Sequence, residues 1–244
     1  SRYALRLEPD LDRASFRGPL AITLDVRQPT SDLVLNAVEL DITGAYVEQA
    51  GTRRQDGRIE MDESLERARV VLHTAIEPGL WTLHLTFNGT LNDKLRGLYR
   101  STYTDATGTT HLLAATQFEA TDARRAFPCW DEPDFKAVFA TTLAIDPALT
   151  AVSNTAVLSE TFEGAKKVIR YADTIKMSTY LVAFVVGKIE STAPVFVGKA
   201  PIRLWAVPGK GHLTPFGLDI AAASLTFFEQ YYGIPYPGDK LDLL

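Results

Sequence analysis

The residues best suited to do chemistry gather in one stretch, TQFEATDARRAFPCWDEP, which runs from Thr116 to Pro133. In an extended segment alternate side chains share a face, so we expect Gln117 and Glu119 to point together while Phe118 points into the core. A carboxylate on a rigid strand beside a neutral amide is suited to binding a small cation, and a free α-ammonium group needs both charge and hydrogen-bond acceptors. The pattern predicts a two-residue polar clamp for such a group.

The remainder of this stretch, from Ala120 to Pro133, is rich in charge and is called the charged stretch below. Thr121 or Asp122 is expected to cap a short helix that runs through Arg125 before Pro128 ends it. Five charged residues are expected to pair locally and to fix the position of the strand: Asp122, Arg124, Arg125, Asp131 and Glu132. The same residues also fit a solvated surface loop whose ion pairs contribute about 0 to 1 kcal/mol each and no chemistry. The residue types alone leave both interpretations open.

The histidines do not form a metal-binding pattern. The chain has four of them, and none is followed by Glu and no two lie four residues apart: His73, His84, His111 and His212. An H-E-x-x-H helix, by contrast, places two histidines on one face with a Glu that activates the metal-bound water. We expect each histidine to be a surface or interstrand residue, and we expect this chain to bind no metal by itself.

The elements that must position the polar clamp are strands. Over the first 110 residues apolar and polar residues alternate, as in Leu20 to Val26 and in Trp81 to Phe87. Turn residues interrupt them at Pro9 to Ser15, at Gly51 to Gly57 and at Glu77 to Gly79. This pattern is typical of half-buried antiparallel strands in a sandwich or an open saddle of sheets, and not of βαβ units.

A second β region follows the charged stretch. One face of an alternating pattern comprises Phe135, Ala137, Phe139, Thr141, Leu143 and Ile145. Ser178 to Gly187 is a nearly continuous apolar run that predicts a strand covered on both sides. One more strand is expected at Ile202 to Val207, followed by a helix at roughly Pro215 to Tyr232 with Gly233 just past its end. The expected buried face of this helix comprises Leu218, Ala221, Ala222, Leu225, Phe228 and Tyr232.

Composition excludes several classes of protein. With 46% apolar and 23% charged residues, the 244-residue chain can build a sizeable core. A formal charge of −5 argues against a nucleic-acid or an anionic-membrane partner, because neither has a basic surface to bind. These 244 residues contain no apolar run of about 18 residues and no charged-then-apolar leader, so we expect neither a membrane span nor a signal peptide within them. Cys129 is the only cysteine, so no internal disulfide forms, and a cytoplasmic location is favoured.

The stretch TQFEATDARRAFPCWDEPDFKAVF resembles the signature of the zinc-dependent aminopeptidases of the aminopeptidase N type, a gluzincin family. Four further segments match that family in order and spacing: LNDKLRGLYRSTY (Leu91 to Tyr103), KMSTYLVAFVVG (Lys176 to Gly187), IRLWAVPGK (Ile202 to Lys210) and FFEQYYGIPYPGDKLDLL (Phe227 to Leu244). The resemblance therefore spans essentially the whole chain.

The resemblance implies a mainly β fold in two parts: an amino-terminal β-saddle or sandwich domain at residues 1–195, and the incomplete beginning of a thermolysin-like α+β catalytic domain at residues 196–244. By the same resemblance Glu119 binds the free α-amine of a peptide substrate, and Gln117 lines the pocket for the first side chain. Cys129 matches a structural cysteine, which we interpret as a small buried thiol.

The resemblance also shows what this chain lacks. The family takes its zinc, its general base and a G-x-M-E-N segment from residues that have no counterpart here, so zinc is expected only in the full-length parent. The partner of this chain would then be the missing catalytic domain, and the chain alone is expected to be inactive. Its unpaired apolar surface at residues 200–244 predicts self-association. The alternative is a non-catalytic β-saddle module for docking or assembly, whose coding sequence would not continue into those motifs.

Overall fold

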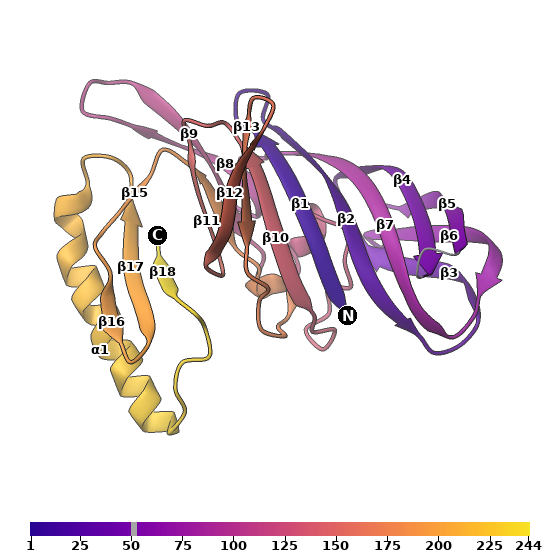
Figure 1. The fold of residues 1–244 in the computed structure, drawn as a ribbon. Coiled ribbons are helices and arrows are strands. Elements are labelled where there is room, and N and C mark those ends of the chain that lie inside the picture. The colour runs from indigo at the N-terminus through magenta and orange to yellow at the C-terminus, as the bar shows by residue number, and fades with distance from the viewer. Residues whose placement is uncertain (50–52) are drawn as a thin grey trace.

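The computed structural model describes residues 1–49 and 53–244. Most of the described chain is strand, and the long helix, α1 (Thr214–Tyr232), comes near the carboxyl end (Figure 1). The strands in chain order are β1 (Arg2–Asp10), β2 (Ser15–Val26), β3 (Thr30–Asn36), β4 (Leu40–Gln49), β5 (Arg53–Asp62), β6 (Arg67–Ile76), β7 (Gly79–Thr90), β8 (Gly97–Thr104), β9 (Thr110–Gln117), β10 (Val138–Ile145), β11 (Thr150–Ser153), β12 (Val157–Glu163), β13 (Lys166–Tyr171), β14 (Phe184–Gly187), β15 (Glu190–Ser191), β16 (Val195–Val197), β17 (Ala200–Ala206) and β18 (Leu241–Leu243). The predicted mainly β fold class is confirmed.

The strands form three sheets within the described residues. A ten-stranded sheet has the order β12-β13-β10-β1-β2-β7-β4-β5-β6-β3, and a four-stranded sheet has the order β11-β14-β9-β8. The third sheet joins β15, β16 and β18 to β17 beside α1. Neighbouring strands are antiparallel except for the pairs β1–β10 and β17–β18, which are parallel. The predicted antiparallel arrangement therefore holds with two exceptions.

Alternation of side chains places the core where the sequence predicts it. Leu20, Ile22, Leu24 and Val26 of β2 are buried, and so are Trp81, Leu83, Leu85 and Phe87 of β7, which pairs with β2. These residues belong to one large hydrophobic cluster that extends from Tyr3 to Val186. A separate small cluster joins Ala200 and Ile202 of β17 to Leu218, Ala221 and Leu225 of α1.

Two predicted strands differ from the structure. The run Ser178 to Gly187 begins with a short 3-10 helix, Thr179–Leu181, and only Phe184–Gly187 is strand. Residue Phe135 is 56% exposed, because Pro133 is followed by a turn in which Phe135 N donates to Glu132 O, and β10 begins only at Val138. Both differences lie next to Pro133 at the end of the charged stretch: Phe135 is in the turn that contains Pro133, and Ser178 Oγ donates to Pro133 O.

The predicted turn at Gly51 to Gly57 is wrong from residue 53 onward, because β5 includes that part; residues 51 and 52 lie outside the described residues. The predicted helix is confirmed over nearly its whole length, and Gly233 follows it in the left-handed conformation that glycine adopts without steric cost. Two of its expected buried residues, Phe228 and Tyr232, are instead 48% and 65% exposed.

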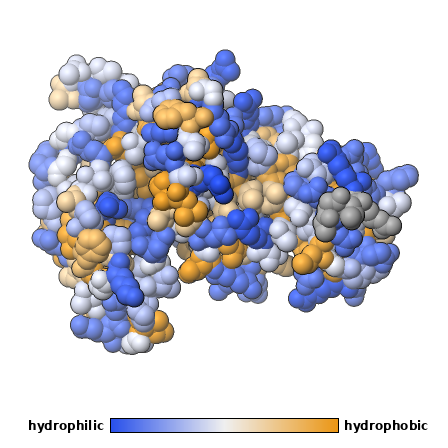
Figure 2. Space-filling view, viewed as in Figure 1, coloured by the Kyte–Doolittle hydropathy of each residue, from blue (hydrophilic) through white to orange (hydrophobic). Residues whose placement is uncertain are grey.

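The described part of the chain contains no helix that is long and apolar enough to cross a membrane. Figure 2 shows hydrophobic and hydrophilic residues intermixed on the surface, including the surface of the helix-bearing part at the left of the view.

Candidate functional site

Gln117 is the last residue of β9, and Glu119 follows two residues later. Both side chains are exposed, whereas Phe118 between them is 2% exposed, as alternation predicts. Within residues 1–49 and 53–244 neither polar side chain forms a hydrogen bond or an ion pair, with the other or with any other residue. The peptide bond between Glu119 and Ala120 is cis. The Glu119 side chain is therefore accessible to solvent and has no ion-pair partner among the described residues.

Phe118 fixes the backbone that carries these two residues. Its ring lies 6.0 Å from that of Phe127 and 6.2 Å from that of Phe184, both in edge-to-face geometry. Its carbonyl oxygen accepts a hydrogen bond of 2.8 Å from Asp122 N, which closes a turn directly after Glu119. Edge-to-face aromatic pairs contribute about 0.5 to 1.5 kcal/mol each beyond the area that they bury. We therefore expect the backbone that carries Gln117 and Glu119 to be rigid.

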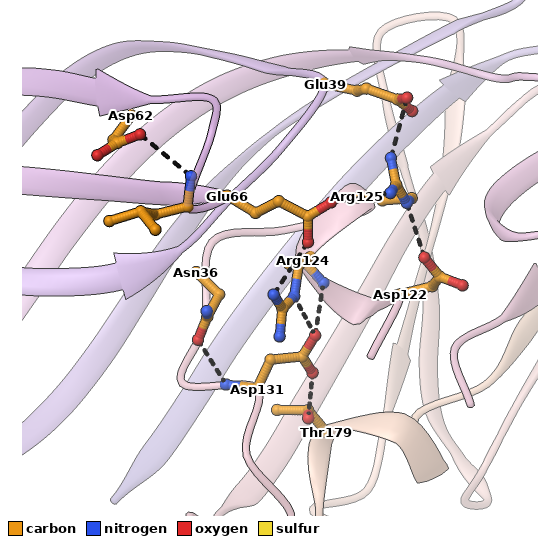
Figure 3. Close-up of polar contacts among 10 residues, drawn as sticks. Asn36, Glu39, Asp62, Glu66, Asp122, Arg124, Arg125, Asp131 and Thr179 are labelled. Carbon is orange, nitrogen blue, oxygen red and sulfur yellow. Dashed lines mark hydrogen bonds and ion pairs between the residues drawn. The ribbon is translucent and has the colours of Figure 1, made fainter. Parts of the chain in front are cut away.

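Arg124 and Asp131, which follow this segment in the sequence, form the centre of a polar network (Figure 3). Asp131 Oδ2 accepts hydrogen bonds from Arg124 Nε at 3.0 Å and from Arg124 N at 3.3 Å, and Asp131 Oδ1 accepts one from Thr179 Oγ1 at 2.6 Å. The Asp131 side chain is 0% exposed and that of Arg124 is 13% exposed. Burial by itself would lower the pKa of Arg124, but the hydrogen bond and charge of Asp131 raise it above its ordinary value.

Arg125 is held by carboxylates from three parts of the chain. Its Nε donates to Asp122 Oδ1 at 2.7 Å, Nη1 lies 2.9 Å from Glu39 Oε1, and Nη2 donates to Glu66 Oε1 at 3.2 Å. Burial opposes the charge, but Asp122 and Glu39 raise the pKa of Arg125. Gly97 lies so close that a Cβ there would be 2.8 Å from the Cβ of Arg125, which explains why a residue without a side chain stands at this position.

The predicted local pairing is therefore confirmed for Arg124 with Asp131 and for Arg125 with Asp122. Glu132 is exposed and joins no ion pair in the described structure. The predicted helix cap is wrong: the helix is a single 3-10 turn, Ala123–Arg125, and the Asp122 carboxylate binds Arg125 and not the backbone.

Sequence reasoning missed the network members from outside the stretch. Glu66 also accepts from Arg124 Nη1, at 3.0 Å, and Asn36 Oδ1 accepts from Asp131 N at 3.2 Å. Glu39 and Glu66 both have positive φ values, 58° and 51°. Such conformations are not visible in a single sequence, so no local signal pointed to these two carboxylates.

Cys129 is a buried thiol, as predicted, with 0% of its surface exposed. Its backbone pairs with Asn36, which ties the charged stretch to the end of β3. Burial, and then the nearby charge of Asp131, raise the pKa of Cys129 well above its ordinary value. A protonated thiol of this kind is neither a nucleophile nor a metal ligand at neutral pH.

The exposed end of β9 adjoins the carboxyl-terminal segment. Thr116, one residue before Gln117, donates its hydroxyl to Phe184 O and accepts from Phe184 N. Phe184 in turn lines a crevice of about 160 Å³ together with Leu241 and Asp242 of β18. A hydrogen bond of 2.9 Å from Ala156 N to Asp239 also links the two parts of the chain. The polar pair thus lies near the junction with the helix-bearing part.

The histidines lie where the sequence predicts. His84 of β7 contacts Glu48 at 3.0 Å, His111 of β9 contacts Asp105 at 2.7 Å, and both His73 and His212 are exposed. Among the residues that the structure describes, no group of three or more His, Cys, Asp or Glu side chains is placed to hold a metal ion.

Comparison with known proteins gives a consistent result. The family model described as "Peptidase M1 N-terminal domain" matches residues 1–181. Aminopeptidase M1-C of Oryza sativa subsp. japonica is 43% identical over 243 residues, which cover 100% of this chain and 27% of that protein. Puromycin-sensitive aminopeptidase of Caenorhabditis elegans is 38% identical over 100% of this chain and 26% of its own length. Aminopeptidase 2, mitochondrial, of Saccharomyces cerevisiae is 40% identical over 98% of this chain and 25% of its own length. The chain spans about a quarter of the length of these curated relatives.

Proposed function

Because this chain belongs to the M1 peptidase family through its amino-terminal domain, we propose that it is the amino-terminal part of a zinc aminopeptidase that removes the first residue from peptides. In this proposal the chain supplies the wall that binds the free amine and the first side chain of the substrate. The observation that carries it is the exposed Glu119 side chain, which has no hydrogen-bond or ion-pair partner in the described structure and follows a Phe118 that is packed against Phe127 and Phe184.

The chemistry of Glu119 fits an α-ammonium group. A charged hydrogen bond contributes about 1.5 to 3 kcal/mol, roughly twice as much as a neutral one. When the amino-terminal nitrogen of the substrate is held at a fixed position, only the first peptide bond reaches the reacting centre. The binding energy of the amine is thus used to orient the scissile bond. Gln117, at the end of β9, is proposed to line the pocket for the first side chain.

Zinc has no site among the described residues, because they contain no cluster of metal-binding side chains. In this proposal the metal and the general base are held by other residues of the full-length protein. By itself the 244-residue chain is proposed to be inactive.

We also propose two domains that meet near residues 195 and 196, so that β15 and β16, which pair with β17, form the connection between them. The large hydrophobic cluster ends at Val186 and the small one begins at Ala200, so each part has its own core. A cytoplasmic location is proposed on the ground that the single cysteine is buried and forms no disulfide.

The reaction can be tested with the purified full-length protein. It should release the first residue from peptides with a free amino terminus, leave amino-terminally acetylated peptides intact, and lose activity when a chelator removes the metal. Equal cleavage of free and acetylated peptides, or no cleavage of either, would refute the proposed function.

A further inference from the structure

The hairpin of β5 and β6 has an ordered tip that lies against the charged stretch. At this tip Asp62 Oδ1 accepts hydrogen bonds from Ser64 Oγ at 2.7 Å and from Leu65 N at 3.1 Å. Glu66 follows with a φ of 51°, and its carbonyl accepts a 2.9 Å hydrogen bond from Ala37 N. The backbone on both sides of Glu66 is therefore fixed, and its carboxylate is directed at residues almost sixty positions later in the chain (Figure 3).

Glu66 bridges the two adjacent arginines of the charged stretch. Its Oε2 accepts from Arg124 Nη1 at 3.0 Å, and its Oε1 accepts from Arg125 Nη2 at 3.2 Å. The arginine side chains are only 13% and 9% exposed, so water screens these pairs less than it screens ordinary surface ion pairs. One carboxylate thus holds both guanidinium groups in a partly desolvated network, where contacts reinforce one another.

A short series of hydrogen bonds leads from Glu66 to Glu119. Arg125, which Glu66 binds, donates to the Asp122 carboxylate at 2.7 Å. The Asp122 backbone N–H donates to Phe118 O at 2.8 Å, and Phe118 immediately precedes Glu119. Because the Glu119 side chain forms no hydrogen bond or ion pair in the described structure, its position depends on this backbone.

We propose that Glu66 is a positioning residue for Glu119: by clamping Arg124 and Arg125 it fixes the turn that sets where the Glu119 carboxylate lies. This inference rests on the proposed function, in which Glu119 binds the substrate amine. Glu66 touches no substrate and acts through Arg125 and Asp122. The segment that carries Arg124 and Arg125 is thus held in part by Glu66, a residue of the β5–β6 hairpin.

The test measures recognition of the amine in the full-length enzyme. For wild type and Glu66→Gln, the inhibition constant of a dipeptide-like inhibitor with a free α-amine is compared with that of its des-amino analogue. The ratio of the two constants reports the amine alone, because loss of folded enzyme affects both inhibitors equally. We expect Glu66→Gln to reduce the preference for the amine about threefold to tenfold, which is typical of residues that act through a network. Glu63→Gln, which alters an exposed acid of the same hairpin, should leave the ratio unchanged.

The double variant Glu66→Gln with Glu119→Gln completes the design. If Glu66 acts through Glu119, it should have no further effect on the ratio once Glu119 is neutral. Additive losses, or an unchanged ratio in Glu66→Gln while Glu119→Gln lowers it, would overturn the positioning role alone. An unchanged ratio in Glu119→Gln would instead refute the proposed function. If Glu66→Gln does not fold, Glu66→Asp, which keeps the charge but shortens the reach, is measured in the same way and is expected to lower the ratio.

Discussion

Arg124 Nε lies 3.0 Å from Asp131 Oδ2, and this ion pair is almost wholly removed from water. It joins the two halves of the charged stretch on either side of Pro128 and Cys129, while Thr179 Oγ1 donates to the second carboxylate oxygen of Asp131. Burying a carboxylate is costly unless its charge and its oxygens are satisfied, and here both conditions are met.

Asp131→Asn should therefore destabilise the protein strongly. The variant leaves Arg124 without its most buried partner, and breaking one side of a buried pair costs about 3 kcal/mol or more. Urea unfolding of the two proteins measures the difference. Glu132→Gln, at the exposed neighbouring position, is the control and should change the free energy of unfolding by less than about 0.5 kcal/mol. Equal effects of the two substitutions would contradict the account of the network.

Much of the fold follows from periodicity. Leu20 and Leu85, which pair across β2 and β7, were both predicted to be buried from alternation alone. The carboxyl end of α1 was also predictable, because a glycine just past the last turn is a local signal. These features depend on neighbours in the sequence, which is why a single sequence reveals them.

The errors arise where distant residues decide the conformation. The run from Ser178 was predicted as strand, but Ser178 Oγ donates to Pro133 O and Thr179 Oγ1 donates to Asp131, which holds a 3-10 turn there. In the candidate site, the exposure of Glu119 followed from alternation, whereas the contribution of Glu66 did not. A contact between a hairpin tip and a loop has no periodic signature.

Cys129 should be unreactive in the folded protein. Its thiol is fully buried and its pKa is raised, so it stays protonated and inaccessible. A disulfide reagent at about pH 8, near the ordinary thiol pKa, should label it only after denaturant is added. The unfolded protein provides the control with one reactive thiol per chain. Rapid, complete labelling of the native protein would show that this part of the core is open.

Asp173 should contribute a small, pH-dependent stabilisation. Its two hydrogen bonds with Arg2, of 2.8 and 2.9 Å, lower the pKa of Asp173. The pKa of Asp173 is therefore lower in the folded protein than in the unfolded chain, where it is about 3.9. The stabilisation by the Arg2–Asp173 pair is then fully present above about pH 3.9 and is lost as the pH falls through the pKa of the folded state. Because both side chains are about half exposed, Asp173→Asn should cost at most about 1 kcal/mol at neutral pH.

The measurement for Asp173 is the difference in unfolding free energy between wild type and Asp173→Asn across the acid range. The difference should shrink below about pH 4. Asp134→Asn, at an exposed carboxylate outside any ion pair of the described structure, should show no such trend. A difference that grows toward low pH would reverse the sign of the linkage and contradict the assignment.

The 244-residue chain by itself should self-associate. The outer face of α1 and the segment after it expose large apolar side chains: Phe216, Ile220, Phe227, Phe228, Tyr231, Tyr232 and Ile234. An apolar face of this kind promotes association when nothing covers it. Light scattering should show a mass above that of the monomer, and replacing Phe227 and Tyr231 with serine should lower it. A clean monomer at high concentration would contradict this prediction.

The central claim is that the Glu119 carboxylate binds the leading nitrogen of the substrate, and kinetics of Glu119→Gln in the full-length protein test it most directly. The variant keeps the size of the side chain and removes its charge. We predict that kcat/KM for peptides with a free amino terminus falls about tenfold or more, since a charged hydrogen bond contributes about 1.5 to 3 kcal/mol, while the melting temperature is unchanged. A kcat/KM equal to that of the wild type would contradict the account.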